Sequence, residues 1–420
     1  EDKLDAGGCR CDPHFKPAWN PDLLLSQNYV AHLSVYRADL VRRIGGFRRG
    51  FEGAEDYDLA LRATEEIAPA QILHIPHVLY HSRRGDESPT LEHDALEAAR
   101  RAVDEHLHRI GSAASVETIT GSYRRVRYAL PEPAPTVSII IATRDHVDLL
   151  RACIESILAR TAYPNFELII VDNESTDRVA LDYLTILAKK PRVRILREPG
   201  AFNFSRLNNI GVAQASSQFV VLLNNDIEVT DGDWLGEMVA HGLQPGIGAV
   251  GARLLYPDGR IQHAGVVLGL AGIGSHAHHG LRHDEDGYFS RPHLTQNVSA
   301  VTGACLLVRR HLYLQLGGLD DVNLPVAFND IDLCLRIGAA GLRVVYTPHA
   351  ELLHHESASR GYEDTPEKHQ RMQKEAEYMR SKWRPQLEAD PAYNPNLALD
   401  SGGNFKLAFP PRVQKPWRQF

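Results

Sequence analysis

Short runs of β-branched and aliphatic residues alternate with longer amphipathic stretches in the middle of the chain. The run 137–141, Val-Ser-Ile-Ile-Ile, is typical of a strand that is buried on both faces of a sheet. Between residues 147 and 159, apolar side chains recur at helical spacing. The same reasoning predicts strands at 166–171, 193–196 and 219–223 and a helix near 206–215. This alternation predicts an α/β domain with a mostly parallel sheet and right-handed crossovers.

Polar residues follow three of these predicted strands. They are, in chain order, Thr143-Arg144-Asp145, Asp172-Asn173 and Asn224-Asn225-Asp226. A single residue of this kind is often only part of a turn or a helix cap. Open α/β sheets bind ligands beyond the carboxyl ends of their strands, so three such groups together predict a ligand-binding site.

Two common nucleotide-binding motifs do not explain this site. The sequence contains no Walker A motif, which argues against a P-loop protein. A Gly-x-Gly-x-x-Gly sequence occurs at 246–251, but it follows a predicted helix and leads into a predicted strand. A dinucleotide-binding loop requires the order strand, glycines, helix, so we do not expect a dinucleotide site here.

Asp226 and a histidine further along the chain are candidate metal ligands. One ligand to consider for this site is a nucleotide-diphosphate sugar, whose sugar is transferred while the nucleotide diphosphate leaves. This leaving group is strongly anionic, and a divalent cation helps it to depart. Carboxylate oxygens suit magnesium, and an added imidazole shifts the preference towards manganese. His354 follows a predicted strand at 342–346 and can supply the imidazole, although a histidine next to another, His355, is often an ordinary polar residue. The sequence thus favours Mn²⁺ or Mg²⁺ as the cofactor.

A carboxylate is also needed to deprotonate an acceptor hydroxyl. Asp330 and Asp332 lie at the start of a predicted helix, 330–339. Residues two apart do not share a helix face, so one can face the site while the other caps the helix or faces solvent. Both can also be ordinary acids near a helix N-terminus. Direct attack that inverts the anomeric centre needs only one base, and the sequence offers no convincing second carboxylate as a covalent nucleophile.

Two distant parts of the chain are similar in sequence. Gly45-Gly46 followed by the block 55–62 matches Gly317-Gly318 followed by the block 329–336. The first copy has only 54 residues ahead of its block, whereas the second has about 190, back to a proline-rich linker. We interpret this as two tandem domains, of which the first lacks its N-terminal half. The alternative is a small domain of different design that shares a few motifs.

The chain resembles family 2 glycosyltransferases with the GT-A fold, a mostly parallel Rossmann-like sheet flanked by helices. The resemblance is strongest to bacterial two-domain transferases of O-antigen and related polysaccharide assembly, which are rhamnosyltransferase-like, and it covers nearly the whole chain. The motifs that carry it lie at 137–145, 171–177, 202–205, 223–228, 302–305, 328–336 and 354–361.

The resemblance implies roles for individual residues. Asp330 matches the general base, and Asp226 and His354 match the metal ligands. Two departures concern this set: Asn224 stands where the acidic motif begins with a carboxylate, and Asn329 stands where glutamate is common. The residues matched to donor binding are Thr143, Asp145, Asp172, Asn203, Asn225 and Asp226.

The resemblance also implies that the first domain is a partial copy of the same fold. Glu1-Asp2 then corresponds to the end of its acidic motif, Asp56 to its base and His81 to its metal histidine. Because the nucleoside-binding strands are absent, this half-domain is expected to be inactive. The expected organisation is a truncated transferase domain at 1–125, a linker at 126–135, a complete transferase domain at 136–370 and a C-terminal extension at 371–420.

Composition adds little that changes this picture. The net charge of −7 gives no indication of a nucleic-acid partner. Five scattered cysteines do not suggest a disulfide framework, and no run of 18 apolar residues predicts a transmembrane helix. The chain begins at Glu1 without a signal peptide, so we expect a fragment. The cysteine usage favours a cytoplasmic location, and the expected partners are a nucleotide-diphosphate sugar, a glycan or lipid-linked glycan acceptor and, peripherally, the inner membrane.

Other functions stay open at this stage. A non-catalytic module that binds nucleotide sugar or glycan does not need the base or the metal ligand, and a nucleotidyltransferase usually has a glycine-rich basic loop after its first strand, which is missing here. The histidine-rich stretch 274–283 suggests a mobile loop over the acceptor side more than a zinc site, because no cysteine is nearby.

Overall fold

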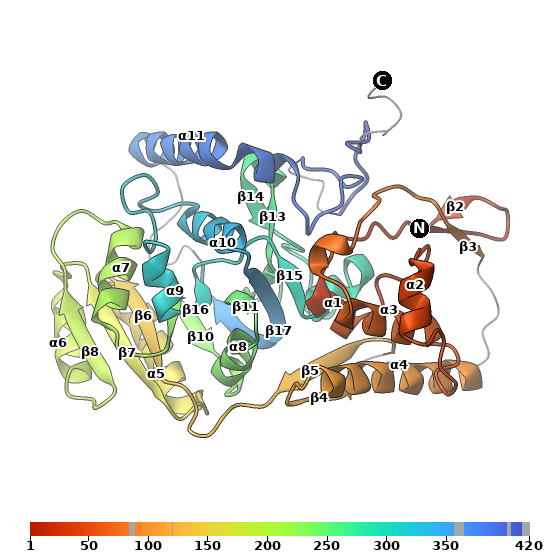
Figure 1. The fold of residues 1–420 in the computed structure, drawn as a ribbon. Helices are drawn as coiled ribbons and strands as arrows, with labels where there is room; N and C mark the ends of the chain where they lie inside the picture. Colours follow the sequence, from red (N-terminus) through yellow and green to blue (C-terminus); the bar gives the residue numbers. More distant parts are fainter. Residues whose placement is uncertain (84–88, 120, 357–364, 401–404, 414–420) are drawn as a thin grey trace. The chain divides into compact units, whose positions relative to one another are not determined.

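The computed structural model describes residues 1–83, 89–119, 121–356, 365–400 and 405–413. The chain forms two compact units (Figure 1). The first unit comprises Glu1–Ala129, Tyr288–Asn297 and Ala389–Phe420, and the second comprises Leu130–Gly287 and Val298–Glu388. The units therefore differ from the contiguous ranges expected from the sequence, because two segments far along the chain fold with its N-terminal part.

A mixed, mostly parallel sheet forms the centre of the second unit. Eight of its strands lie in the order β10-β17-β11-β16-β9-β6-β7-β8. Strands β6 to β9 are parallel, as predicted, and β11 is parallel to β17. Strand β16 is antiparallel to β9 and β11, and β10 is antiparallel to β17. The bounds are β6 Val137–Thr143, β7 Phe166–Asp172, β8 Val193–Arg197, β9 Phe219–Asn224, β10 Ile227–Val229, β11 Ile247–Leu255, β16 Cys305–Arg309 and β17 Arg343–His354.

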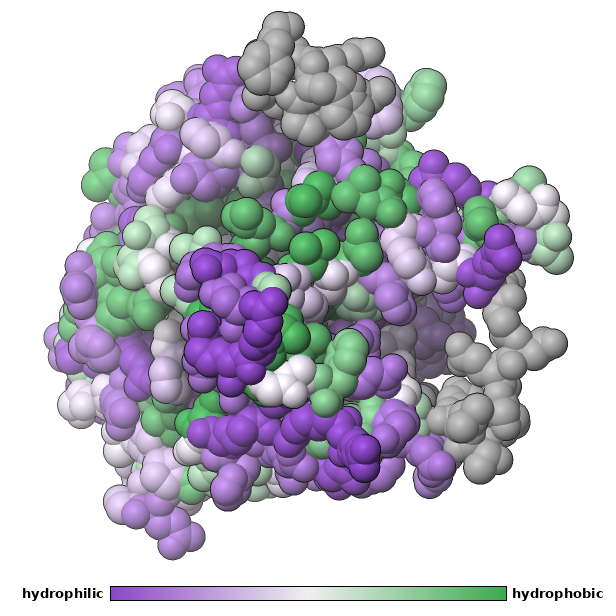
Figure 2. All heavy atoms as spheres, turned by 45° about the vertical axis from the view of Figure 1, so that its right-hand side comes forward, coloured by the Kyte–Doolittle hydropathy of each residue, from purple (hydrophilic) through white to green (hydrophobic). Residues whose placement is uncertain are grey.

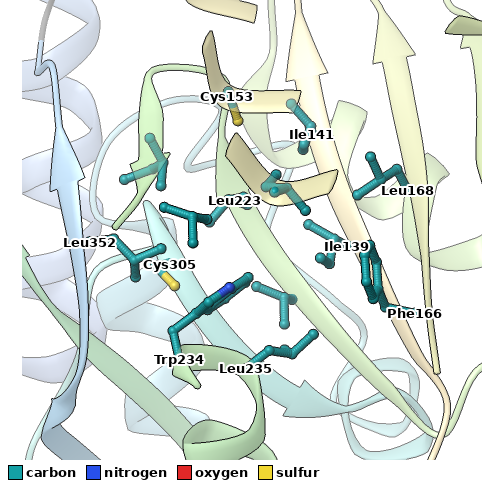
Figure 3. Packing of buried hydrophobic residues seen from close by; sticks show 14 of the residues in the cluster. Ile139, Ile141, Cys153, Phe166, Leu168, Leu223, Trp234, Leu235, Cys305 and Leu352 are labelled. Carbon is teal, nitrogen blue, oxygen red and sulfur yellow. The ribbon is translucent and has the colours of Figure 1, made fainter. Parts of the chain in front are cut away.

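Successive side chains of each strand pack against different helices. Ile139 and Ile141 belong to one apolar cluster, with helices α5, α6 and α8, and Ile140 to another, with α7, α9, α10 and α11. In Figure 3, Trp234 of α8 reaches into the first cluster beside Cys305. Helices on both faces thus fix the strand ends in place. They are α5 Val147–Arg160, α6 Arg178–Leu187, α7 Phe204–Gln214, α8 Trp234–Gly242, α9 Arg310–Gln315, α10 Asn329–Ala339 and α11 Pro366–Glu388.

The helices and strands predicted for this part of the sequence are confirmed, with shifts at their ends. The 246–251 glycines follow α8 and lead into β11, as expected. The largest difference is in β17, which extends to His354 rather than ending near 346. His354 is therefore held in the sheet, not in a following loop. Short elements complete the second unit: β12 Ile261–His263, β13 Val266–Leu268, η2 Leu270–Gly272 and β14 Gly274–His276.

The first unit has its own core. Helices α1, α3 and α4 and the hairpin of β4 and β5 enclose Tyr57, Leu61, Val103 and Leu107. Leu294, which is fully buried, joins them from the 288–297 segment. The elements are β1 Asp2–Leu4, β2 Arg10–Cys11, α1 Pro21–Ser26, α2 Ala38–Arg43, α3 Glu55–Glu65, η1 Pro69–Gln71, β3 His81–Arg83, α4 Pro89–Arg109, β4 Ala114–Thr118, β5 Arg124–Tyr128 and η3 Tyr288–His293, with β15 Gln296–Val298 at the boundary.

The two similar sequence blocks form the same local structure. Arg62 of α3 contacts Asp58 and donates to the backbone carbonyls of Ile44 and Gly46. In the second unit, Arg336 of α10 contacts Asp332 and donates to the carbonyls of Leu316 and Gly318. In both units an arginine thus ties a helix to the carbonyls just before and within a Gly-Gly turn. That the first unit is a truncated transferase domain stays a prediction.

Apolar side chains also occur at the surface among polar ones (Figure 2). Those of the first unit include Leu33, Val35, Leu73, Ile75 and Leu79, all at least 60% exposed. No helix in the described ranges combines the length and the apolar composition that crossing a membrane requires.

Candidate active site

A cavity of about 700 Å³ opens in the second unit at the carboxyl ends of β6 and β9. The start of α10 and the end of β17 complete its wall. Of the residues proposed from sequence, it brings together Thr143, Asp145, Asn225, Asp226, Asp330 and His354. The strand-end residues converge because β6 lies directly beside β9 in the sheet.

Thr143 and Asn225 connect the ends of two neighbouring strands. The Asn225 side-chain amide donates to Thr143 Oγ1 over 3.1 Å. Asp145 holds the adjacent loop, since its Oδ1 accepts from the backbone amides of Thr176 and Asp177 at 2.8 Å each. These amides, that of Asp177 first, lower the pKa of Asp145. Its carboxylate therefore stays ionised and fixes the shape of this wall.

Asp172 and Asn203 are not among the residues that line the cavity. Asp172 Oδ1 accepts from the backbone amide of Ser175 at 3.0 Å. Asn203 caps the N-terminus of α7, where its Oδ1 accepts from the backbone amide of Arg206 at 2.9 Å. Both side chains thus have structural partners, and their direct contact with a donor stays a prediction.

The antiparallel pairing of β10 with β17 brings Asp226 next to His354, because Ile227 lies opposite His354 in the register. Both side chains are buried, at 4% and 5% exposure. Asp226 Oδ1 lies 3.3 Å from His354 Nε2, yet this buried oxygen makes no hydrogen bond. An oxygen and a nitrogen that face each other in this way, without a bond between them, fit two ligands of one cation.

This pair fits a hard divalent cation only as part of a larger set of ligands. In the described ranges, no group of three or more His, Cys, Asp or Glu side chains is placed to hold a metal ion. Mg²⁺ and Mn²⁺ take about six ligands, so phosphate oxygens and water must supply the rest. Asn224, which stands where the resemblance expects an acid, has its Nδ2 3.4 Å from His354 Nε2.

The two acids of α10 have different surroundings. Asp330 lines the cavity and accepts from the backbone amides of Gly303 and Ile331, each at 2.8 Å. Burial raises its pKa, which makes it a stronger base. Asp332 is fully enclosed and contacts Arg336, Trp383 and Lys382 instead. Only Asp330 is therefore placed to meet a ligand.

Other cavity residues gave little signal in the sequence. Gln262 comes from β12, His276 from β14 and Glu356 from the residue pair after His354, while Lys368 and Arg371 come from α11. The histidine-rich stretch was the only indication. Its first histidine, His276, ends strand β14 and its next, His278, is buried, while the rest of the stretch is mostly turns. That this stretch is a mobile loop over the acceptor side stays a prediction. Residues 357–361 of the last family motif lie outside the described residues.

The first unit contains a similar aspartate–histidine pair, but its aspartate also contacts an arginine. Asp2 forms a hydrogen bond with His81, as β1 pairs with β3. The Arg10 guanidinium contacts the other carboxylate oxygen. Although burial opposes it, these two partners lower the pKa of Asp2. Arg10 thus supplies the positive charge here, whereas no arginine or lysine pairs with Asp226 in the described residues. Asp56, the expected base, accepts from Asn28 Nδ2 at 3.1 Å.

Comparison with known proteins identifies a family for part of the second unit. Residues 138–315 match the profile of "Glycosyl transferase family 2". The second unit therefore contains a family 2 glycosyltransferase domain, and its α/β fold is of the GT-A type.

Two long relatives match almost the whole chain. "Uncharacterized protein y4gI" of Sinorhizobium fredii is 52% identical over 419 residues, which cover 98% of this chain and 46% of that protein. "O-antigen biosynthesis protein RfbC" of Myxococcus xanthus is 42% identical over 411 residues, which cover 95% of this chain and 31% of that protein. The chain thus spans less than half the length of these relatives.

A shorter relative and a solved structure are each similar to little more than half of the chain. The "N-acetylglucosaminyl-diphospho-decaprenol L-rhamnosyltransferase" of Mycobacterium tuberculosis is 27% identical over 245 residues, 54% of this chain and 77% of that protein. The mannosyltransferase PcManGT from Pyrobaculum calidifontis, solved with GDP-Man and Mn²⁺, has a TM-score of 0.43 and 18% identity, over 59% of this chain and 64% of its own.

Proposed function

We propose that the second unit transfers a sugar, with inversion, from a nucleotide-diphosphate sugar to a hydroxyl of a growing cell-surface polysaccharide. The observation that carries this proposal is the convergence of Asp226, His354 and Asp330 on one cavity. The first two suit a cation that binds a diphosphate, and the third suits proton removal from a hydroxyl. A module that only binds sugars has no need of a buried base.

In this proposal the nucleotide lies at the strand ends. Thr143 and Asn225 form the floor beneath the nucleoside, and the loop fixed by Asp145 forms its side. Lys368 and Arg371 line the same cavity and bring positive charge to the anionic phosphates. A cation held by Asp226 and His354 would neutralise the charge of the leaving diphosphate.

Asp330 then acts on the acceptor. It accepts the proton of the attacking hydroxyl while that oxygen bonds to the anomeric carbon from the side opposite the diphosphate. The backbone amides of Gly303 and Ile331 hold its carboxylate in position during this step. One base and one displacement give inversion at the anomeric carbon.

The names of the relatives support the polysaccharide context. One acts in O-antigen biosynthesis and another transfers L-rhamnose to a lipid-linked sugar diphosphate. We therefore place the reaction at the cytoplasmic side of the inner membrane, with a glycan or lipid-linked glycan acceptor and Mn²⁺ or Mg²⁺ as cofactor.

The test is to incubate the chain and Mn²⁺ with a panel of nucleotide-diphosphate sugars and p-nitrophenyl glycosides, and to measure nucleotide diphosphate release. We expect release with at least one donor, accelerated by an acceptor, and a product whose anomeric configuration is opposite to that of the donor. The control variant Asp182→Asn changes an exposed acid of α6 and should behave like the wild type. A folded protein that releases no diphosphate from any donor would overturn the proposal, and a retained configuration would overturn inversion.

A further inference from the structure

His276 forms part of the cavity wall and contacts a second histidine, His263, which does not line the cavity. His263 ends β12 and is completely buried, and His276 ends β14 and lines the cavity. Their rings meet edge to face, with centroids 4.9 Å apart. The two Nδ1 atoms are 2.8 Å apart, so one donates a hydrogen to the other.

The direction of this hydrogen bond follows from the other nitrogen of His263. Its Nε2 lies 3.3 Å from the backbone amide of Gly265 and 3.4 Å from that of Thr302. Backbone amides only donate, so Nε2 must be unprotonated. Burial holds the pKa of His263 well below its usual value, so the ring is neutral and its single hydrogen lies on Nδ1. His263 therefore donates to His276.

His276 is fixed in turn. Its Nδ1 accepts from His263, and burial lowers its pKa to about 4, so the neutral ring carries its hydrogen on Nε2. The neighbour of this N–H is Gln262 Nε2 at 3.4 Å, which is itself a donor, directed to Glu356 Oε2 at 3.4 Å. Rotating the Gln262 amide by half a turn would bring its oxygen against the Glu356 carboxylate, and two such oxygens repel each other. The His276 N–H is thus available to a ligand in the cavity.

Glu356 provides the complementary group. Its Oε2 accepts from the Tyr256 hydroxyl and from Gln262, and the residue lines the cavity beside His276. A sugar presents neighbouring hydroxyls, each of which donates and accepts hydrogen bonds. One fixed N–H donor beside one fixed carboxylate acceptor matches such a pair of hydroxyls.

We propose that His276 and Glu356 form a subsite that binds two hydroxyls of the acceptor sugar, with His263 as the positioning residue that fixes the His276 tautomer. The assignment to the acceptor rests on the proposed function, because the nucleoside occupies the β6 and β9 side of the cavity and this pair lies on the β12, β14 and β17 side. The subsite selects acceptors by hydrogen bonds and takes no part in proton transfer.

Two measurements on the full chain test this subsite. In ¹⁵N NMR of the histidine rings, His263 should carry its hydrogen on Nδ1 and His276 on Nε2, with His263→Asn and His276→Gln used to assign the signals. The opposite tautomers would overturn the positioning role. Binding of a panel of p-nitrophenyl glycosides, measured with the nucleotide diphosphate and Mn²⁺ present, tests the subsite itself.

His276→Leu should weaken binding of the best glycoside about 10–100-fold while nucleotide binding changes less than about 2-fold. His276→Gln, which keeps an N–H donor at a similar distance, should restore most of the affinity. Unchanged glycoside binding in His276→Leu, no glycoside binding by the wild type, or a loss of nucleotide binding instead would each overturn the subsite. Glycoside binding without any diphosphate release would overturn the proposed function and leave the subsite intact.

Discussion

Replacing the two acids of α10 one at a time should separate catalysis from folding. Asp330 lines the cavity and accepts from the backbone amides of Gly303 and Ile331, whereas Asp332 is enclosed and contacts Arg336, Trp383 and Lys382. Asp330→Asn should lower turnover about 10²–10⁴-fold, because the amide cannot accept the proton of the acceptor hydroxyl.

The same variant should be as stable as the wild type or more stable. Burial raises the pKa of Asp330, so the folded protein binds a proton at this carboxyl more readily than the unfolded chain does. Folding is therefore weakened as pH rises above the ordinary pKa of an aspartate, and the neutral amide removes that cost. The melting temperature of Asp330→Asn at pH 8 should equal or exceed that of the wild type.

Asp332→Asn should lower the stability of the protein and leave turnover of the folded protein nearly unchanged. It leaves Arg336 and Lys382 without their anionic partner, which costs about 2–4 kcal/mol of unfolding free energy. The lower part of this range is expected, since the two cations are 18% and 30% exposed and water replaces part of the contact. Urea unfolding and diphosphate release at low temperature measure the two effects. Near-normal turnover in Asp330→Asn, together with lost turnover in folded Asp332→Asn, would move the base to Asp332.

Three further predictions follow from the structure. Excess chelator should abolish transfer and Mn²⁺ or Mg²⁺ restore it, and Asp226→Ala should weaken metal and donor binding; full activity in chelator would contradict the metal site. Because the pKa of Asp330 is raised, kcat/KM should fall as pH falls through a value above 3.8, and a profile that stays level in acid would refute this. A fragment of residues 1–129 lacks Leu294 of its core, so its amides should exchange rapidly with solvent; cooperative unfolding would show an independent domain.

The sequence predicted those parts of the site that follow directly from strand ends. Thr143, Asn225 and Asp226 follow buried runs, and parallel neighbours place such residues together. Helical spacing alone left Asp330 and Asp332 as alternatives, because the choice depends on Trp383 and Lys382, about 50 residues away.

Other features depend on long-range contacts without a local pattern. His276 at the end of β14 and Glu356 just after β17 reach the cavity because of how these strands pair, and neither strand's register can be read from its own residues. Nothing near Leu294 indicates that its segment completes the core of the first unit, since an isolated leucine between polar residues is common in loops.

The first unit is built from three separate segments of the chain, and this affects the order in which the two units can fold during synthesis. Its core needs Leu294, and hydrogen bonds join Asn20 to Asn297 and Pro76 to Asn396. At about 5–20 residues per second, residue 396 emerges roughly 13–53 s after residue 129. During that interval Tyr57 and Leu61 lack part of their cover. On the ribosome, we therefore expect the second unit's parallel strands β6 to β9 to be complete before the first unit closes, so that of these two units the one that emerges earlier becomes resistant to proteases later.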